Sequence, residues 1–479
     1  MKSIMAAGWI AVAFLAASAP GEAAKAKPKP KAGTVTAAAA TPPSAGPLNP
    51  TRFPVARHTL PNGLVILLHE DHSVPAVTFW QWYRVGSRNE GPGITGISHF
   101  FEHMMFNGSK NVPPKEYDRI IESNGGVSNA FTDRDMTAYY EDIASDRLEV
   151  LFRVDSDRMR ELLLAPELLK SEIEVVKEER RLRTDNDISG MLDESLYATA
   201  FLASPYRWPV VGWMADLNRM KRDELVSYFR TYYAPNNCIL VLTGDFDSKS
   251  ALALIQKYFG DIPAQTPSQP PINSEPEQRG ERRAQVRYPV ENESFQMGYK
   301  APNAKSEDTW VLDILSSILG DGESSRLHQS LVYEKQIALD ASTFFRSRID
   351  PTLFEFAVEM KPGKPAREGE AVLDEVLSRL VKEGPSPREL EKAKNALEAD
   401  LVKSLKTNNG VGEQLGFYEH VYGDYRTLYG AIERYRKVTL EDCKRVARAT
   451  FVPERRTVVE LVPVAEPEAK AEAKPEAKP

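Results

Sequence analysis

The sequence predicts an α+β protein with two similar domains, each a mostly antiparallel sheet packed with helices. Segments with the apolar patterns of strands occur in clusters between longer segments with helical spacing. A segment rich in proline, glutamine, serine and glutamate, 261–283, links a first domain at 51–260 to a second at 284–464. Residues 234–242 and 452–461, near the two domain ends, resemble each other. This repeat indicates a duplicated fold, with chance similarity of two α+β domains as the alternative.

The first domain begins with an expected hairpin at 58–69, because Asn62-Gly63 favours a two-residue turn between two strands. A stripe of apolar residues predicts a helix at 147–162. The same reasoning gives further strands at 76–85, 127–132, 136–143 and 237–245, and further helices at 114–123, 166–184, 193–201, 222–233 and 249–259. In the second domain it gives a strand at 295–299 and a short apolar helix at 310–320.

The chain ends have compositions that differ from the two domains. Residues 1–23 combine a lysine, an apolar core and small residues, which predicts a secretory signal peptide; an uncleaved leader is the alternative. Its apolar core is too short to span a membrane, so we expect a periplasmic or secreted protein without a membrane span. Residues 24–50 and 465–479, rich in alanine, proline and charged residues, are expected to be a disordered linker and a disordered tail.

The net charge of −7 argues against nucleic-acid binding. Only two cysteines are present, Cys238 and Cys443, so an exported protein of this kind does not depend on a disulfide framework. Whether these two cysteines pair with each other stays open.

A histidine pair dominates the short helix expected at 96–108. His99 and His103 are four residues apart and therefore lie one turn apart on one face, with Glu102 close to that face. Two imidazoles at this spacing can hold one zinc ion, and a neighbouring carboxylate can accept a proton from a water that the metal activates. The surrounding residues are almost all apolar, so the helix is buried and its polar groups need partners. A structural histidine pair without metal is the alternative.

The helix at 166–184 supplies candidates for a third zinc ligand. Glu172, Val175, Val176 and Glu179 follow one another at helical spacing along a single stripe. A carboxylate on an apolar stripe needs a cation, so Glu179 is the expected ligand and Glu172 the residue that orients a histidine from behind. The other glutamates of this helix, Glu174 and Glu178, lie on another face, where solvated charge is unremarkable.

The apolar helix at 310–320 occupies the corresponding place in the second domain. Aligning Gly320 with Gly108 puts apolar residues at the positions of the three motif residues: Val311, Ile314 and Leu315. The second domain is therefore expected to carry no metal.

The order H-x-x-E-H, with Glu179 76 positions later, resembles the pitrilysin or insulysin family of inverzincin metallopeptidases. The length and repeat are similar to its bacterial single-chain branch, which is related to mitochondrial processing peptidase. The resemblance implies one Zn²⁺ per chain on His99, His103 and Glu179, with Glu102 as general base. It further implies that peptide substrates pair with the strand at Asn129-Ala130, and that two chains close like a clam around a chamber.

One stretch departs from the family pattern. Active members carry an Arg and a Tyr in a non-metal domain, and the aligned positions here hold Val332 and Leu339. Arg326 and Tyr333 have the right separation but lie six positions too early. The resemblance therefore implies the zinc-bearing half of a two-subunit enzyme, whose related partner supplies the Arg and Tyr; a homodimer is the alternative.

Two other functions compete with an exported zinc endopeptidase. A non-catalytic structural or assembly subunit of the same fold has no need for all four of His99, Glu102, His103 and Glu179. A metal-storage protein has no need for Glu102 beside the ligands. The complete set therefore favours the peptidase.

Overall fold

The computed structural model describes residues 48–464 except 50, 52 and 267–273. The expected signal peptide and tail lie outside this part, as does nearly all of the 24–50 linker. Leu48 is described and belongs to a cluster of buried apolar residues that includes Trp80 and Trp82. Among the described residues, no helix is long and apolar enough to cross a membrane.

The first sheet has six strands in the order β1-β2-β6-β3-β5-β4. The strands are β1 (Ala56–Thr59), β2 (Val65–Glu70), β3 (Ala76–Tyr83), β4 (Val127–Thr132), β5 (Thr137–Ala144) and β6 (Cys238–Gly244). All neighbours pair antiparallel except β2 and β6, which are parallel, so the sheet is mixed. The expected hairpin is present as β1 and β2. β4 forms one edge of the sheet.

The second sheet repeats this order without an equivalent of β1. Its strands run β7-β11-β8-β10-β9, and only β7 and β11 are parallel. The strands are β7 (Arg282–Tyr288), β8 (Ser294–Ala301), β9 (Ala338–Phe344), β10 (Thr352–Met360) and β11 (Arg456–Pro463). The two similar segments noted in the sequence form β6 and β11, which hold the same position in the two sheets. The common topology is what a duplicated fold requires.

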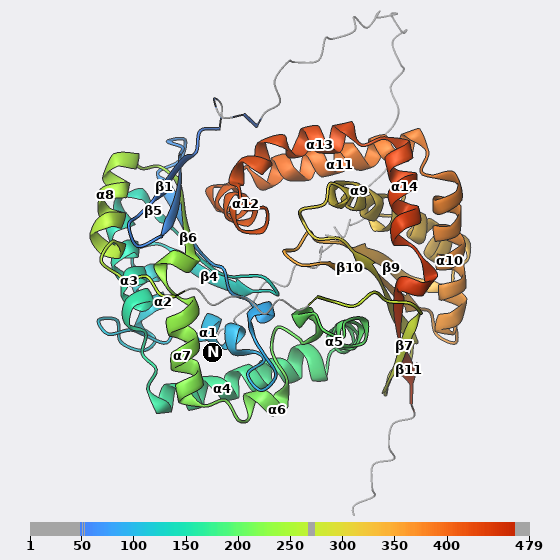
Figure 1. The fold of residues 1–479 in the computed structure, drawn as a ribbon, viewed down its shortest axis with the longest axis horizontal. Helices are drawn as coiled ribbons and strands as arrows, with labels where there is room; N and C mark the ends of the chain where they lie inside the picture. The colour runs from blue at the N-terminus through green and yellow to red at the C-terminus, as the bar shows by residue number, and fades with distance from the viewer. Residues whose placement is uncertain (1–47, 50, 52, 267–273, 465–479) are drawn as a thin grey trace, which may run out of the picture.

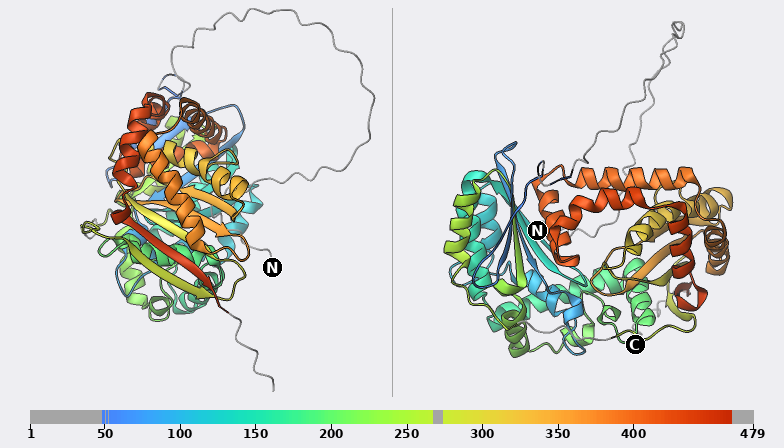
Figure 2. Two further views of the ribbon diagram at one scale, coloured as in Figure 1. Left: turned by 90° about the vertical axis from the view of Figure 1, so that its right-hand side faces the viewer. Right: turned by 45° about the horizontal axis from the view of Figure 1, so that its top comes forward.

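Helices pack on both faces of each sheet (Figures 1 and 2). Those of the first half are α1 (Ile97–Met104), α2 (Glu116–Ser123), α3 (Leu148–Glu161), α4 (Pro166–Arg180), α5 (Ile188–Ala200), α6 (Met214–Leu217), α7 (Arg222–Tyr232) and α8 (Ser248–Phe259). Those of the second half are α9 (Asp308–Gly320), α10 (Ala366–Glu383), α11 (Pro387–Ser404), α12 (Asn408–Val421), α13 (Ala431–Lys437) and α14 (Leu440–Thr450). α5 begins five residues before the expected start, because the Asp187 side chain caps its N-terminus by accepting from the Gly190 amide.

Each half covers one face of the other half's sheet. α12 lies against β3 and β6 of the first sheet, and α5 lies against β7, β8 and β11 of the second. Glycines allow this close approach: a Cβ on Gly416 would lie 2.1 Å from Nε1 of Trp82, and one on Gly412 would lie 2.4 Å from Cδ1 of Trp80. The two halves are therefore interlocked, and neither sheet is covered by its own half alone.

The expected linker at 261–283 is also attached to both halves. The Glu275 carboxylate accepts from the backbone amides of residues 202–204 in the first half, and Nε2 of Gln278 donates to the Arg456 carbonyl in the second half at 2.7 Å. β7 begins at Arg282, two residues before the expected domain start. Cys238 in β6 and Cys443 in α14 are both buried and free, which answers the open question of their pairing.

Candidate metal centre

The helix that carries the motif, α1, is held at its N-terminus by a buried carboxylate. Glu90 is 2% exposed and accepts from the backbone amides of Gly96 at 2.8 Å and Ser98 at 2.9 Å. Burial raises the pKa of Glu90 to about 8, even though both amide hydrogen bonds lower it. Gly96 takes φ +88°, and a Cβ there would lie 2.4 Å from the Val211 carbonyl oxygen. The position of α1 is thus fixed by contacts that the motif itself does not reveal.

A second carboxylate, Asp216 of α6, holds the segment that precedes α1. It accepts from the amides of Gly93 and Thr95 and, at 2.7 Å, from the Thr95 hydroxyl. Sequence reasoning missed both Glu90 and Asp216. An acidic residue near a glycine-rich approach to a helix was the available signal for Glu90.

Three predicted ligands converge between α1 and α4. Nε2 of His103 lies 3.0 Å and Nε2 of His99 lies 3.6 Å from the same Oε2 of Glu179. One ligand atom from each side chain falls within 4.8 Å of the others, and no other group of this kind occurs in the described part of the chain. His99 is 7% exposed, and its Nδ1 has no hydrogen-bond partner among the residues that the structure describes. Two imidazole nitrogens and one carboxylate oxygen at this spacing fit a zinc ion with ligand distances of about 2.0–2.2 Å.

Glu172 holds His103 from behind, as predicted from the sequence. Its Oε1 lies 2.8 Å from Nδ1 of His103, and its Oε2 accepts from Nδ2 of Asn107 at 2.6 Å. Burial lowers the pKa of His103, but hydrogen bonds to Glu172 and Glu179 outweigh it and raise that pKa to about 10. A metal ion that binds Nε2 of His103 would have to displace a proton from it.

The second oxygen of Glu179 is also engaged. Arg183 lies 2.8 Å from Oε1, which leaves Oε2 turned towards the two histidines. Burial raises the pKa of Glu179, but the histidine contacts dominate and hold it well below its ordinary value. Sequence reasoning missed Arg183, although its i,i+4 spacing from the glutamate was a usable signal.

The remaining residues of α4 divide as expected, with one exception. Glu174 and Glu178 are exposed and pair with Lys177 and Arg181, which fits solvated charges. Val175 was expected on the buried stripe and is instead 49% exposed, while Val176 is fully buried. The buried stripe of α4 is therefore narrower than predicted.

Glu102 and the edge strand lie beside the three ligands. Glu102 is half-buried on α1, next to His103 in the chain. α1 packs against β4, and the Tyr139 hydroxyl of β5 donates to the Phe101 carbonyl of α1 at 3.0 Å. Asn129 and Ala130 lie on β4, which pairs with β5 on one side and is the last strand of the sheet on the other. On its other side, β4 pairs with no strand of the described part of the chain.

The second half has the predicted apolar counterpart. Val311, Ile314 and Leu315 of α9 are all buried in the second core. Arg326 is committed to an ion pair with Glu389, with Nε to Oε1 at 2.6 Å, whereas Tyr333 is 69% exposed.

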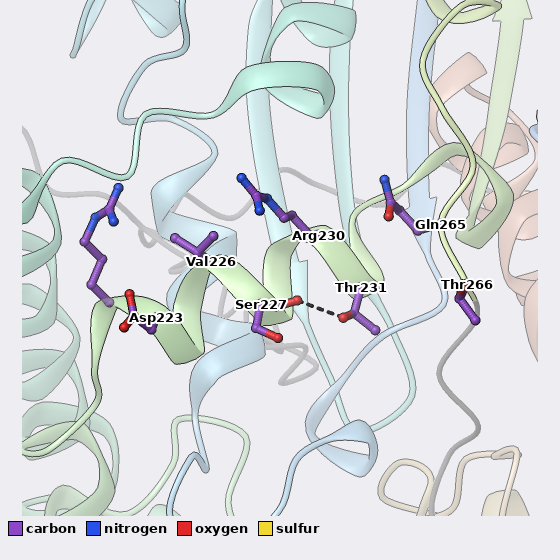
Figure 3. A pocket seen from close by; sticks show the side chains of 8 residues that line it. Asp223, Val226, Ser227, Arg230, Thr231, Gln265 and Thr266 are labelled. Atoms are coloured by element: carbon purple, nitrogen blue, oxygen red, sulfur yellow. Dashed lines mark hydrogen bonds between the residues drawn. The ribbon is translucent and has the colours of Figure 1, made fainter.

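The pocket drawn in Figure 3 is formed by α7 and the segment at 265–266. It is lined by Arg222, Asp223, Val226, Ser227, Arg230, Thr231, Gln265 and Thr266. It contains none of the residues predicted for chemistry.

Comparisons with known proteins identify the family to which both halves are similar. Residues 65–212 match the model of the insulinase family, peptidase family M16, and residues 219–397 match the model of the M16 inactive domain. The zinc protease PqqE of Helicobacter pylori is 32% identical over 409 residues, covering 85% of this chain and 92% of PqqE.

More distant and structural likenesses agree. The mitochondrial-processing peptidase subunit beta of Lentinula edodes is 27% identical, over 81% of this chain and 86% of its own length. The crystal structure of a protease from Helicobacter pylori superposes with a TM-score of 0.83 at 32% identity, covering 86% of this chain and all of that one. With a cluster of two histidines and a glutamate in the half that matches the insulinase model, the chain belongs to peptidase family M16, the pitrilysin or insulinase family of zinc proteases.

Proposed function

We propose that this protein is a zinc endopeptidase that hydrolyses peptides or unfolded segments. The observation that carries the proposal is the convergence of His99, His103 and Glu179 beside Glu102 and the open edge of β4. In this proposal the three converging side chains bind Zn²⁺, one ion per chain. When bound, the ion would polarise the scissile carbonyl and lower the pKa of an adjacent water.

The chain's own residues supply the remaining steps. Glu102 accepts the proton of the attacking water on its carboxylate and can return it to the leaving amine. Glu172 keeps the His103 ring oriented through Nδ1. Asn129 and Ala130 bind the substrate backbone as an added strand, which gives affinity with little sequence preference.

We further propose that the active form contains two chains closed around a chamber. Val332 and Leu339 stand where active relatives are expected to carry an Arg and a Tyr, and the ion pair with Glu389 restrains Arg326. A related subunit would then supply those two side chains, and a homodimer is the alternative. The leader at 1–23 supports export to the periplasm or outside the cell.

A comparison of two glutamine variants tests the peptidase. The mature chain from Ala24 is purified, and zinc content and hydrolysis of a quenched fluorescent peptide are measured with and without a related co-expressed subunit. Glu102→Gln should keep zinc and lose at least 10²-fold in rate, because it removes the proton acceptor. Glu178→Gln, an exposed change on α4, should keep both the zinc content and the hydrolysis rate of the wild type.

The same assay separates the competing functions. Zinc binding without hydrolysis in either preparation, and identical behaviour of Glu102→Gln and the wild type, would favour a structural or assembly subunit. Full activity of the chain alone would contradict the hypothesis of a two-subunit enzyme and favour a homodimer.

A further inference from the structure

The turn that joins β4 to β5, which we call the hairpin tip (residues 133–136), forms ion pairs and a hydrogen bond with the second half. These contacts come from the β9–β10 loop (residues 345–351). Nη1 of Arg348 lies 3.3 Å from Oδ2 of Asp133 and 3.8 Å from Oδ2 of Asp135. The Ile349 amide also donates to Oδ2 of Asp135, at 3.2 Å. Arg348 is 5% exposed and Asp135 2% exposed, so these charges are shielded from solvent and interact strongly.

Asp133 links this contact with Arg348 to the backbone conformation of the hairpin tip. Its Oδ1 accepts from the backbone amides of Asp135 at 2.6 Å and Met136 at 3.1 Å, while its Oδ2 faces Arg348. One carboxylate therefore both shapes the turn and binds the second half. A shift of Arg348 would be transmitted to the ends of β4 and β5.

The hairpin tip also contacts the approach to α1. The Ser87 amide donates to the Asp133 carbonyl at 3.2 Å, and the Arg88 amide donates to the Arg134 carbonyl at 2.9 Å. A Cβ on Gly86 would lie 2.5 Å from the Asp133 oxygen, so this contact is tight. Residues 87–89 lead directly into Glu90, which caps α1.

A second contact ties the same approach to the loop. Nη2 of Arg88 donates to Oδ2 of Asp350 at 2.7 Å, and the Asp350 amide donates to the Tyr206 hydroxyl at 3.0 Å. That hydroxyl in turn donates to Oδ1 of Asp135 at 2.5 Å. The loop thus contacts both the turn in which β4 ends and the segment that leads to α1.

We propose that Arg348 is a positioning residue, through which the metal-free half sets the alignment of the β4 edge relative to α1. This proposal rests on the proposed function, because it assigns β4 to substrate binding. A peptide added to the β4 edge binds productively only while that edge keeps its position relative to α1, so a less firmly held edge weakens peptide binding and raises KM. The half without zinc ligands then contributes to activity by keeping the β4 edge in position relative to α1.

Arg348→Lys tests the proposal, with Arg346→Lys as the matched control. Arg346 lies in the same loop, 3.4 Å from Oδ2 of Asp133, but is one-third exposed and has no ion pair with Asp135 among the described residues. Zinc content, unfolding midpoint, kcat and KM are measured, with hydrogen exchange of residues 127–137. Arg348→Lys should raise KM at least fivefold and speed exchange in that segment, with kcat within twofold and zinc content unchanged. Arg346→Lys should have the same zinc content, unfolding midpoint, kcat, KM and hydrogen exchange as the wild type.

Tyr206→Phe provides a second variant that keeps packing and removes only the hydroxyl between Asp135 and Asp350; it should raise KM and exchange in the same direction. Unchanged KM and exchange in both variants would overturn the proposal. So would a parallel loss of kcat and unfolding midpoint in both, which is the behaviour of a purely structural contact. If the wild type hydrolyses nothing, the proposed function fails, whereas the exchange data still decide whether Arg348 holds the hairpin tip.

Discussion

Replacing Glu172 by glutamine should weaken zinc binding without changing a ligand. The carboxylate is 15% exposed and lies 2.8 Å from Nδ1 of His103. Glutamine keeps the length of the side chain and can still accept one hydrogen bond. It removes the negative charge that fixes the His103 ring and increases its basicity, and it puts an amide where Asn107 donates.

The expected loss can be bounded from the contacts. A hydrogen bond to a charged group contributes about 1.5–3 kcal/mol in a partly buried site. At about 1.4 kcal/mol for each factor of ten, this corresponds to a Kd for zinc raised about 10- to 100-fold. The same range is typical for partners that support a metal-binding histidine.

The affinity is measured by competition for zinc with a chromophoric chelator at fixed pH. Glu174→Gln is the control, since Glu174 lies on the same helix, is exposed and touches neither histidine. Equal zinc affinity for the Glu172 variant and wild type, within twofold, would refute the assignment of Glu172 as the support of His103.

Three further predictions concern pH, stability and the second half. Zinc binding should strengthen as pH rises towards about 10, because His103 must lose the proton on Nε2 that faces Glu179; proton release in calorimetry measures this. In the ion-free protein the same proton stabilises the fold below pH about 6.5, and this contribution is lost as pH rises through about 10. Gly416→Ala should destabilise the fold by about 1–3 kcal/mol in denaturant titrations, since the added Cβ meets an indole ring. Arg326→Met should leave kcat/KM unchanged and reduce stability near neutral pH.

The Arg326 prediction also has an acid signature. Burial raises the pKa of Glu389, but its pairing with Arg326 and its bonds to Ser386 lower that pKa to about 2. In the wild type this stability is present above pH about 4.5 and is lost as pH falls towards 2. The variant should lose less over that interval. A large drop in kcat/KM would instead show that Arg326 contacts substrate.

The control for the glycine prediction is Gly91→Ala. An added Cβ there meets nothing within 4 Å, so the unfolding midpoint should stay within experimental error of the wild type. A comparable loss in both variants would contradict the overlap argument for α12.

Local pattern was sufficient to identify the three side chains that converge as candidate metal ligands. His99 and His103 share a face because a helix repeats every 3.6 residues, and Glu179 was separated from Glu178 by the same periodicity. The hairpin β1–β2 and the apolar α9 followed from equally local signals. These features depend on residues close together in the chain, which is why the sequence determined them.

Contacts between distant segments were decided only by the tertiary structure. The caps on α1, the open side of β4 and the parallel strand pairs all depend on partners that no periodicity reveals. Val175 was misplaced for the same reason, since burial depends on what packs against α4.

The interlocking of the two halves is the largest feature that the sequence left undetermined. The sequence divided the chain into consecutive domains, whereas α5 and α12 each cover the other half's sheet. Arg348 and Asp133, which join the halves, are separated by 215 positions. A local pattern records which face of a helix is apolar, but not which of two similar sheets that face will cover. That choice depends on shape and charge complementarity across the whole molecule.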